Sequence, residues 1–484
     1  MSKQQQIKNA GIYMVPTAVS VLLPIVSLPI ILHSLSPSDY GAYALSLAFS
    51  SIVVGFSQFA LLSVYERNFF LLTSEKERSQ LCFTIISFIV FILIIVGLVI
   101  YLKKDYLASI IIKSPQYGLL LFYTYIGLAL QASSNYYLSF LKNIGNAKMN
   151  VGVTLAMSVI GVVLNIYFVG ILMIGPIGLA LGLFISNAVI FITVTIYFIK
   201  KYKYTLNKNL LFHSLELSMR LIPSSILSVI GKQYDKYIIG VLASVGGAGI
   251  YALGQRIAKL VVLFMNAIQK VYGPIVYHKM FSKDSKKGGK EIGKYLTPFA
   301  YFSVASALFI ALFSEEVIII LAPPEYLEAL YVINILCVGY GVAFFAKQPQ
   351  IMYAGKTTLL SVLSFVNFVG TVVVLYIFVN YYGLLGAAVG YLLMSIIYNT
   401  LLVWQGQKYY RIEYEWSKLL AIFGMLFFVS ISIMLFQVWG LAYYYRLMIK
   451  ILFLGMFTGL GMHLKIITKS NIELAFKNNK TITV

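Results

Sequence analysis

Long apolar segments follow one another along this chain from end to end, with only short polar stretches between them. Each has about 20 residues, the length that crosses roughly 30 Å of hydrocarbon at about 1.5 Å per helical residue. Charged residues make up 11% of the sequence, whereas soluble proteins contain about 25%. The pattern predicts an all-α integral membrane protein with 14 transmembrane helices. The predicted spans are residues 10–33, 41–65, 81–102, 117–141, 149–172, 177–199, 219–243, 248–270, 296–320, 327–346, 357–379, 384–405, 418–438 and 442–464.

The second constraint is an internal duplication. The pentapeptide Gly-Ala-Tyr-Ala-Leu at 41–45 recurs as Gly-Ile-Tyr-Ala-Leu at 249–253, a shift of 208 residues. The same shift superposes Lys148 on Lys356, Gly175 on Gly383, Gly178 on Gly386, Ala180 on Ala388 and Gly182 on Gly390, and Pro16 meets Pro223 after a one-residue slip. Two halves of six spans each would have the same orientation, so we expect a pseudo-two-fold axis along the membrane normal.

This duplication defines the expected domains. Residues 1–210 form an N-lobe with helices 1–6, and residues 211–410 form a C-lobe with helices 7–12. Residues 411–484 contain two extra C-terminal helices, 13–14, and a cytoplasmic tail.

Basic residues gather in alternate loops, and the largest group lies between residues 270 and 294. Because cytoplasmic loops carry an excess of Lys and Arg, the alternation predicts that the N and C termini are cytoplasmic. On the outer side we expect only Lys103, Lys104, Lys113 and Arg446. The net charge of +21 is therefore spread over loops. This argues against nucleic acid as a partner and for membrane lipids as the surroundings.

A few charged residues remain inside the predicted spans, where each costs about 2.5 to 3.5 kcal/mol on insertion scales. Lys232, Asp235 and Lys236 share one helical face by their spacing, and Arg256 with Lys259 form a second pair on the next helix. One repeat earlier, the last two positions are Ala48 and Ser51.

The charges are therefore specific to the second half. They predict a cationic substrate-binding cavity for phosphate or pyrophosphate, with Asp235 orienting the cations or titrating. Arg220, at the cytoplasmic end of the same span, is included as a gate residue or an interfacial anchor. The alternative is structural: Asp235 pairs with Arg256 or Lys236 while the lysines extend to the interface.

Other chemistry is not indicated. Cys82 and Cys337 lie in apolar spans and the four histidines are widely separated, so we expect neither a metal site nor a cofactor. The segment 354–358 ends like a phosphate-binding loop but lacks its first glycine, because Gln350 occupies that position. Without clustered external carboxylates or a catalytic triad, the sequence predicts that the protein is not an enzyme.

Three segments in order carry a family resemblance: Leu-Ser-Pro-Ser-Asp-Tyr-Gly-Ala-Tyr at 35–43; Pro223 leading to Asp235-Lys236 and Gly249-Ile250-Tyr251; and Tyr-Leu-Glu-Ala at 326–329. With fourteen spans, the chain resembles the Wzx-type polysaccharide (O-antigen repeat-unit) flippases of the MOP superfamily, whose relatives include MATE antiporters and lipid II flippases.

The resemblance implies a V-shaped fold of two lobes around a cationic cavity in the bacterial inner membrane, and a role in lipopolysaccharide or other polysaccharide biosynthesis. The implied substrate is an undecaprenyl-pyrophosphate-linked oligosaccharide. A proton or sodium gradient is the implied energy source, and a glycan polymerase and chain-length proteins are implied partners.

The leading hypothesis is therefore a flippase that moves this lipid-linked oligosaccharide by alternating access. A multidrug or metabolite antiporter of the same superfamily is the first alternative, and it would need a smaller and less basic pocket. A membrane-embedded glycan polymerase or ligase is the second alternative. That enzyme would need a large external loop, and the predicted loops are short.

Overall fold

The computed structural model of the chain describes residues 19–20, 22–281, 285–346 and 349–468. These residues form helices joined by short turns, with no strand among them. The elements are α2 (Leu28–Ser34), α3 (Pro37–Ser57), α4 (Leu61–Leu71), α5 (Glu75–Leu102), α6 (Lys104–Ile111), η1 (Pro115–Tyr117), α7 (Gly118–Asn143), α8 (Ala147–Asn165), η2 (Ile166–Ile171), α9 (Ile177–Lys201), α10 (Lys208–Met219), α11 (Ile222–Ile230), α12 (Tyr234–Leu242), α13 (Val245–Phe281), α14 (Ser285–Leu312), α15 (Ser314–Leu321), η3 (Pro324–Tyr326), α16 (Ala329–Val342), η4 (Ala343–Ala346), α17 (Pro349–Tyr353), α18 (Thr357–Tyr409), α19 (Trp416–Val438) and α20 (Tyr443–His463).

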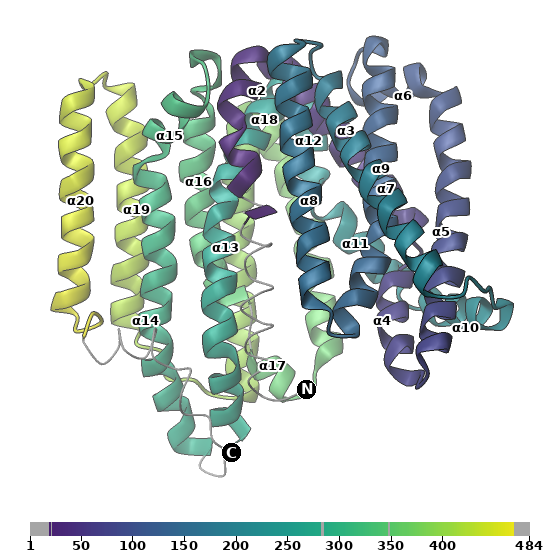
Figure 1. Ribbon diagram of the computed structural model, residues 1–484. Coiled ribbons are helices and arrows are strands. Elements are labelled where there is room, and N and C mark those ends of the chain that lie inside the picture. Colours follow the sequence, from purple (N-terminus) through teal and green to yellow (C-terminus); the bar gives the residue numbers. More distant parts are fainter. Residues whose placement is uncertain (1–18, 21, 282–284, 347–348, 469–484) are drawn as a thin grey trace. The chain divides into compact units, whose positions relative to one another are not determined.

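The described residues fall into two compact units. The first extends to Ile250 and includes Leu321–Glu325, and the second comprises Tyr251–Ile320 and the chain from Tyr326 onward. Within each unit the long helices lie side by side (Figure 1). In the first unit α7 packs against α3, α5 and α9, and in the second α16 packs against α14, α18 and α19. These units are defined by packing, whereas the expected lobes, with boundaries near residues 210 and 410, are defined by the duplication. The lobe boundaries stay a prediction.

Within the described ranges, ten helices are long and apolar enough to cross a membrane. The protein is therefore an all-helical, multi-pass membrane protein, as the sequence predicts. One of the ten, α18, has 53 residues, about 80 Å if it were straight and more than twice the hydrocarbon thickness. Gly383 interrupts it with φ 58° and ψ −138°, a conformation that needs glycine. α18 thus consists of two consecutive helices, where the sequence predicts the spans 357–379 and 384–405.

The turn at Gly383 has a counterpart in the first unit. Gly175, its partner under the shift of 208 residues, also has a positive φ of 73° and precedes α9. The next superposed pair is also sterically constrained. A Cβ atom at Gly178 would lie 2.9 Å from Val169 Cγ2, and one at Gly386 would overlap the Phe378 carbonyl oxygen. In both copies, glycine lets the two helices of a hairpin pack closely.

At the other end of these hairpins the expected alignment is wrong. Gly145, with φ 79°, precedes α8, and Gly355, with φ 67°, precedes α18. These glycines are 210 residues apart, not 208. The N-cap residue is Lys356 in α18 but Asn146 in α8, so Lys148 is not the equivalent of Lys356. The first hairpin has two more residues between its glycine turns, and that stretch contains the π-helix η2, whose turns are wider than those of an α-helix. Pro16, expected to pair with Pro223, lies outside the described residues.

The duplicated pentapeptides meet at their first residues, Gly41 in α3 and Gly249 in α13. A Cβ atom at Gly41 would overlap the carbonyl oxygen of Val245, and a Cβ atom at Gly249 would overlap that of Pro37. Val245 follows Pro37 by 208 residues, as Gly249 follows Gly41. The contact of Gly41 with Val245 is therefore equivalent to the contact of Gly249 with Pro37. All four residues belong to the first unit. The contact is locally two-fold symmetric, and glycine is needed there because no side chain fits between the two backbones.

Candidate functional site

The span expected at 219–243 is not one helix. It is divided into α11 and α12, and Gly231, Lys232 and Gln233 form the turn between them. Glycine disfavours a helix by about 1 kcal/mol relative to alanine, and the three turn residues donate their N–H groups to carbonyls three or four residues earlier. Lys232 therefore lies in the interruption, while Asp235 and Lys236 lie in the first turn of α12. The interpretation that these three charged residues share one continuous helical face is wrong.

A second interruption lies between α3 and α4, inside the span expected at 41–65. Phe59 and Ala60 have φ values of 48° and 56°, a left-handed conformation that is uncommon for residues other than glycine. The two interrupted helices are neighbours, because a Cβ atom at Gly55 of α3 would lie 2.7 Å from Val229 Cγ1 of α11. Irregular backbone at membrane depth is tolerated where it is buried in protein or lines a wet cavity.

The two interruptions line the same cavity, which has a volume of about 250 Å³. Its polar lining consists of Ser51, Gln58, Gln131, Asn135, Lys232 and Gln233. These side chains come from the end of α3, from the middle of α7 and from the turn between α11 and α12. All of them belong to the first unit. Amide and hydroxyl groups both donate and accept hydrogen bonds, so the cavity offers one cation surrounded by neutral polar groups.

Lys232 is the cation of this cavity. Its side chain is exposed, and within the described part of the chain its ammonium group has no hydrogen-bond or ion-pair partner. Lys236 differs, because its Nζ lies 3.7 Å from Asp235 Oδ1 and 3.3 Å from Gln233 Oε1. The Asp235 and Lys236 side chains are only 10% and 12% exposed. This pair is electrically neutral, which leaves the charge of Lys232 available to an anion.

The other candidate residues lie elsewhere. Arg220 is exposed at the C-cap of α10. Arg256 and Lys259 are one turn apart on α13, and Lys259 Nζ donates a 2.9 Å hydrogen bond to Gln255 Oε1. Arg256 and Lys259 belong to the second unit. A single pocket containing all six residues stays a prediction, as does the role of each in substrate binding.

The sequence interpretation missed part of the cavity. The candidate site residues taken from the sequence do not include Gln58, Gln131, Asn135 or Gln233. The available signal was the dipeptide Gly231-Lys232 in an apolar span, which combines a poor helix former with a charge.

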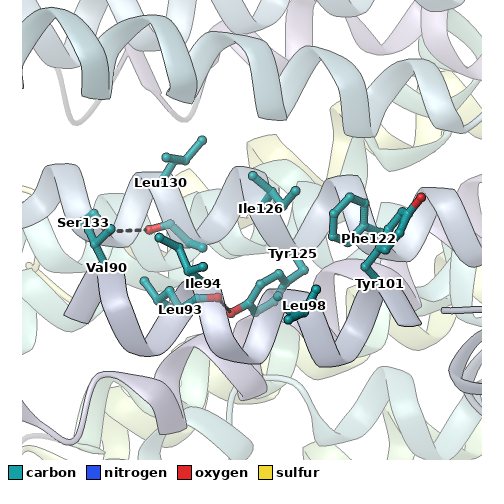
Figure 2. A pocket seen from close by; sticks show the side chains of 12 residues that line it. Val90, Leu93, Ile94, Leu98, Tyr101, Phe122, Tyr125, Ile126, Leu130 and Ser133 are labelled. Carbon is teal, nitrogen blue, oxygen red and sulfur yellow. Dashed lines mark hydrogen bonds between the residues drawn. The ribbon is translucent and has the colours of Figure 1, made fainter. Parts of the chain in front are cut away.

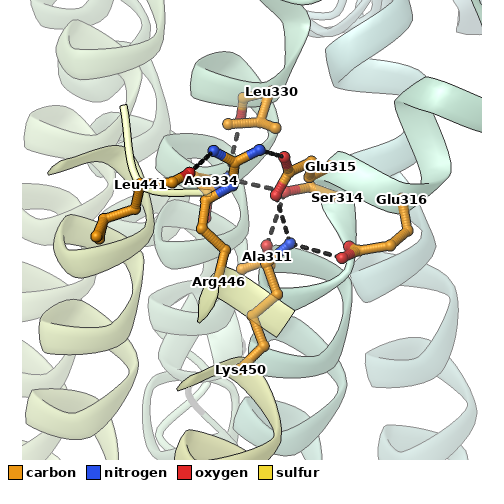
Figure 3. Close-up of polar contacts among 9 residues, drawn as sticks. All are labelled: Ala311, Ser314, Glu315, Glu316, Leu330, Asn334, Leu441, Arg446 and Lys450. Carbon is orange, nitrogen blue, oxygen red and sulfur yellow. Dashed lines mark hydrogen bonds and ion pairs between the residues drawn. The ribbon is translucent and has the colours of Figure 1, made fainter. Parts of the chain in front are cut away.

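A second buried charged cluster was also missed, and it belongs to the second unit (Figure 3). Lys450 Nζ of α20 lies 2.6 Å from Glu315 Oε2 and 2.7 Å from Glu316 Oε1 of α15. Arg446 Nη2 lies 2.6 Å from Glu315 Oε1. The Lys450 and Glu315 side chains are 1% and 4% exposed. Two carboxylates and two cations thus neutralise each other inside the protein and connect α20 to α15. The sequence feature that could have indicated this cluster is the presence of charged residues in two apolar spans. Arg446 and Lys450 are four residues apart in one span, and Glu315 and Glu316 are adjacent in the other.

The sequence and the fold of this chain are similar to those of known proteins. The profile of a family described as "Polysaccharide biosynthesis protein" matches residues 33–331. A comparison with curated protein sequences gave no significant match.

Solved structures share the fold. The lipid II flippase MurJ, in an inward closed conformation, superposes with a TM-score of 0.69 at 15% identity, over 93% of this chain and 99% of that one. An inward-facing multidrug resistance MATE transporter of the MOP superfamily gives 0.60 at 17% identity, over 81% and 94%. A MOP superfamily transporter from Pyrococcus furiosus gives 0.53 at 15% identity, over 84% and 98%.

Proposed function

The chain belongs to the polysaccharide biosynthesis protein family and has the MOP superfamily fold, and from this premise we propose that it is a flippase for lipid-linked oligosaccharides. The resemblance expected from the sequence is thus confirmed for family and fold. The proposed substrate is an undecaprenyl-pyrophosphate-linked repeat unit, which crosses the bacterial inner membrane by alternating access. One observation carries the proposal: Lys232, without a partner in the described chain, lies in a helix interruption that lines a polar cavity.

The chemistry of the cavity suits both parts of such a head group. A pyrophosphate is an anion, and Lys232 supplies a point charge for it. Sugar hydroxyl and acetamido groups need partners that both donate and accept hydrogen bonds, which Gln58, Gln131, Asn135 and Gln233 provide. The lipid chain would stay in the bilayer. Discontinuous helices that line a binding site near the midplane are a recurrent arrangement in transporters.

The proposed topology keeps fourteen spans with cytoplasmic termini. Counting α18 as two spans, and adding α7, the α11–α12 pair and the helix that ends at Ser34, brings the ten apolar helices to this number. The lobes 1–210 and 211–410 and the appended helices in 411–484 remain part of the proposal. Arg256 and Lys259, with Arg220 as a gate or anchor, would complete the cationic cavity, and an ion gradient would drive the cycle.

A drug or metabolite antiporter is the second candidate. The cavity volume of about 250 Å³ favours it, because this volume is slightly below the range of about 300–1,000 Å³ for pockets that bind drug-sized ligands, and an oligosaccharide needs still more room. The single cation and the many neutral polar groups favour the flippase.

The decisive experiment is complementation of a strain that lacks this protein. Replacing Lys232 by alanine should reduce glycan display at the cell surface by about tenfold or more, because a hydrogen bond to a charged group contributes about 1.5 to 3 kcal/mol. Lipid-linked intermediates should accumulate in the inner leaflet. The matched control is Lys142→Ala, which removes a lysine of the same unit that pairs with Glu66 and does not line the cavity.

Normal display in both Lys232→Ala and the double variant Arg256→Ala/Lys259→Ser would exclude the cationic cavity as the substrate site. Altered drug resistance with unchanged glycan display would favour the antiporter.

A further inference from the structure

A second hollow of the first unit lies between α5 and α7 and has a volume of about 430 Å³ (Figure 2). Val90, Ile94, Leu98 and Tyr101 line it from one face of α5. Gly97 contributes the depth, because a Cβ atom there would already lie 3.1 Å from Tyr125 Cε1. The hollow is therefore a groove along α5, and its depth comes from the absence of a side chain at Gly97.

The groove offers almost nothing to a polar ligand. Of its polar side chains, the Tyr125 hydroxyl donates a 2.8 Å hydrogen bond to the Leu93 carbonyl oxygen, and the Ser133 hydroxyl donates a 2.9 Å bond to that of Ala129. The dashed lines in Figure 2 show both. The rest of the lining is hydrocarbon, apart from Tyr101 at one end. A ligand that fills the groove must therefore be a hydrocarbon chain.

The length of the groove suits one leaflet. Val90 and Tyr101 are eleven residues apart on α5, about 16 Å at 1.5 Å per residue. This is roughly half of the hydrocarbon thickness of about 30 Å. Ile94 and Leu98 are 65% and 59% exposed, so the groove is open to the lipid along its side.

Positive charge lies at the Tyr101 end. Lys104 Nζ is 5.2 Å from the centroid of the Tyr101 ring and 3.3 Å from Asp105 Oδ2. Lys103, the C-cap of α5, is exposed. The proposed topology places this end on the outer side, which is otherwise poor in basic residues. A phosphate group attached to a chain in the groove would lie beside these two lysines.

α7 also links the groove to the polar cavity. Ile126, Ala129 and Ser133 face the groove, whereas Leu128, Gln131 and Asn135 face the cavity. At about 100° per residue these sets lie on opposite sides of one helix at the same depth. A helix is about 10 Å thick with its side chains, so head-group and chain positions are adjacent.

We propose that the groove between α5 and α7 binds the polyprenyl chain of the transported lipid once the head group has crossed to the outer side, with the phosphate then beside Lys103 and Lys104 and no longer at Lys232. The inference rests on the proposed function and adds a site for the lipid tail. The occupant is the polyprenyl lipid and not bulk phospholipid, because α7 lines both the groove and the cavity assigned to the substrate head group.

Photo-crosslinking tests this assignment with adjacent residues of the same type. A benzophenone amino acid replaces Ile94, which lines the groove, or Ile95, which is 46% exposed on α5 and does not line it. The protein is reconstituted in phosphatidylethanolamine and phosphatidylglycerol vesicles with a small molar fraction of undecaprenyl phosphate. Adducts are identified by mass spectrometry. We expect the polyprenyl adduct to be about tenfold more abundant at position 94 than at 95, and to decrease in the double variant Lys103→Ala/Lys104→Ala.

The sugar-free probe separates this inference from the transport function. Labelling at position 94 should persist in Lys232→Ala, even where glycan display is lost. Equal polyprenyl labelling at both positions, or phospholipid adducts alone at position 94, would overturn the inference and leave the flippase proposal intact. Ile94→Trp supplies a second measurement, since it should fill the groove and lower glycan display while Ile95→Trp should not.

Discussion

Two sites in this protein contain charged side chains within apolar segments of the chain, and the sites differ in whether those charges are paired. In the second unit, Lys450 is buried and contacts two carboxylates. In the first unit, Lys232 lines a cavity and has no ionic partner within the described ranges. Removing an ion from water costs several kcal/mol unless close partners and hydrogen bonds compensate. The paired cluster is thus an element of structure, whereas the cavity lysine keeps its charge for a ligand.

The paired cluster should give the largest effect on stability. Lys450→Met leaves Glu315 with Arg446 but removes the only ion-pair partner of Glu316 in the described chain. We expect a loss of about 3 to 5 kcal/mol in the free energy of unfolding, as for one partner removed from a buried pair. The thermal midpoint of the purified protein in detergent measures it. Adding Glu316→Gln should restore part of the loss.

The control for this variant is Lys418→Met, which breaks a more exposed pair with Glu415 whose side chains are 30% and 23% exposed. Its cost should stay below about 1 kcal/mol. If Lys450→Met destabilised the protein no more than Lys418→Met does, burial would not make the ion pairs of Lys450 more important for stability than the exposed pair of Lys418.

An exposed pair at the end of α7 should have a smaller, pH-dependent effect. A 2.7 Å hydrogen bond from Lys142 lowers the pKa of the Glu66 carboxyl group below its ordinary value. Because the folded-state pKa is the lower one, the stabilisation is present above the unfolded-state pKa of about 4.3 and is lost as the pH falls through the folded-state pKa. Glu66→Gln should cost less than about 1 kcal/mol at neutral pH.

The thermal midpoints of wild type and Glu66→Gln should therefore converge as the medium is acidified. Lys142→Gln should show the same convergence. A difference that stays constant with pH would assign the stability effect to packing of the glutamate and not to its charge.

The cavity lysine should give the smallest stability effect. Lys232→Met should change the free energy of unfolding by no more than about 0.5 kcal/mol, the usual range for a surface substitution, while it lowers glycan display as Lys232→Ala does. Thermal unfolding and surface glycan are measured on the same variant. A stability loss approaching that of Lys450→Met would make Lys232 a structural residue and remove the contrast between the two sites.

Much of the fold could be predicted because two physical signals are strong. Hydrocarbon thickness sets the length of apolar spans, and the duplication pairs Gly41 with Gly249 and Gly175 with Gly383, positions where the backbone requires glycine. Helix interruptions could not be predicted in the same way. The left-handed conformation of Phe59 and Ala60 depends on tertiary packing, and nothing in those residue types indicates it.

The site was predicted less well, for a related reason. Lys232 was identified from its charge alone, but its neighbours in the cavity come from α3 and α7, far away in sequence. The same limitation hid the cluster in the second unit. Glu315 and Lys450 are separated by 135 residues, so spacing along the chain could not show that they neutralise each other.

The π-helix at Ile166–Ile171 has a consequence for how the two copies diverged. The wide turns of the π-helix take up the two additional residues, so the residues of α8 that precede it align with the second copy at a shift of 210 and not 208. Both glycine turns of the hairpin are nevertheless retained. An insertion taken up by wide helical turns changes the number of residues in one hairpin while its connections stay in place, so duplicated halves can diverge in length without losing their shared topology.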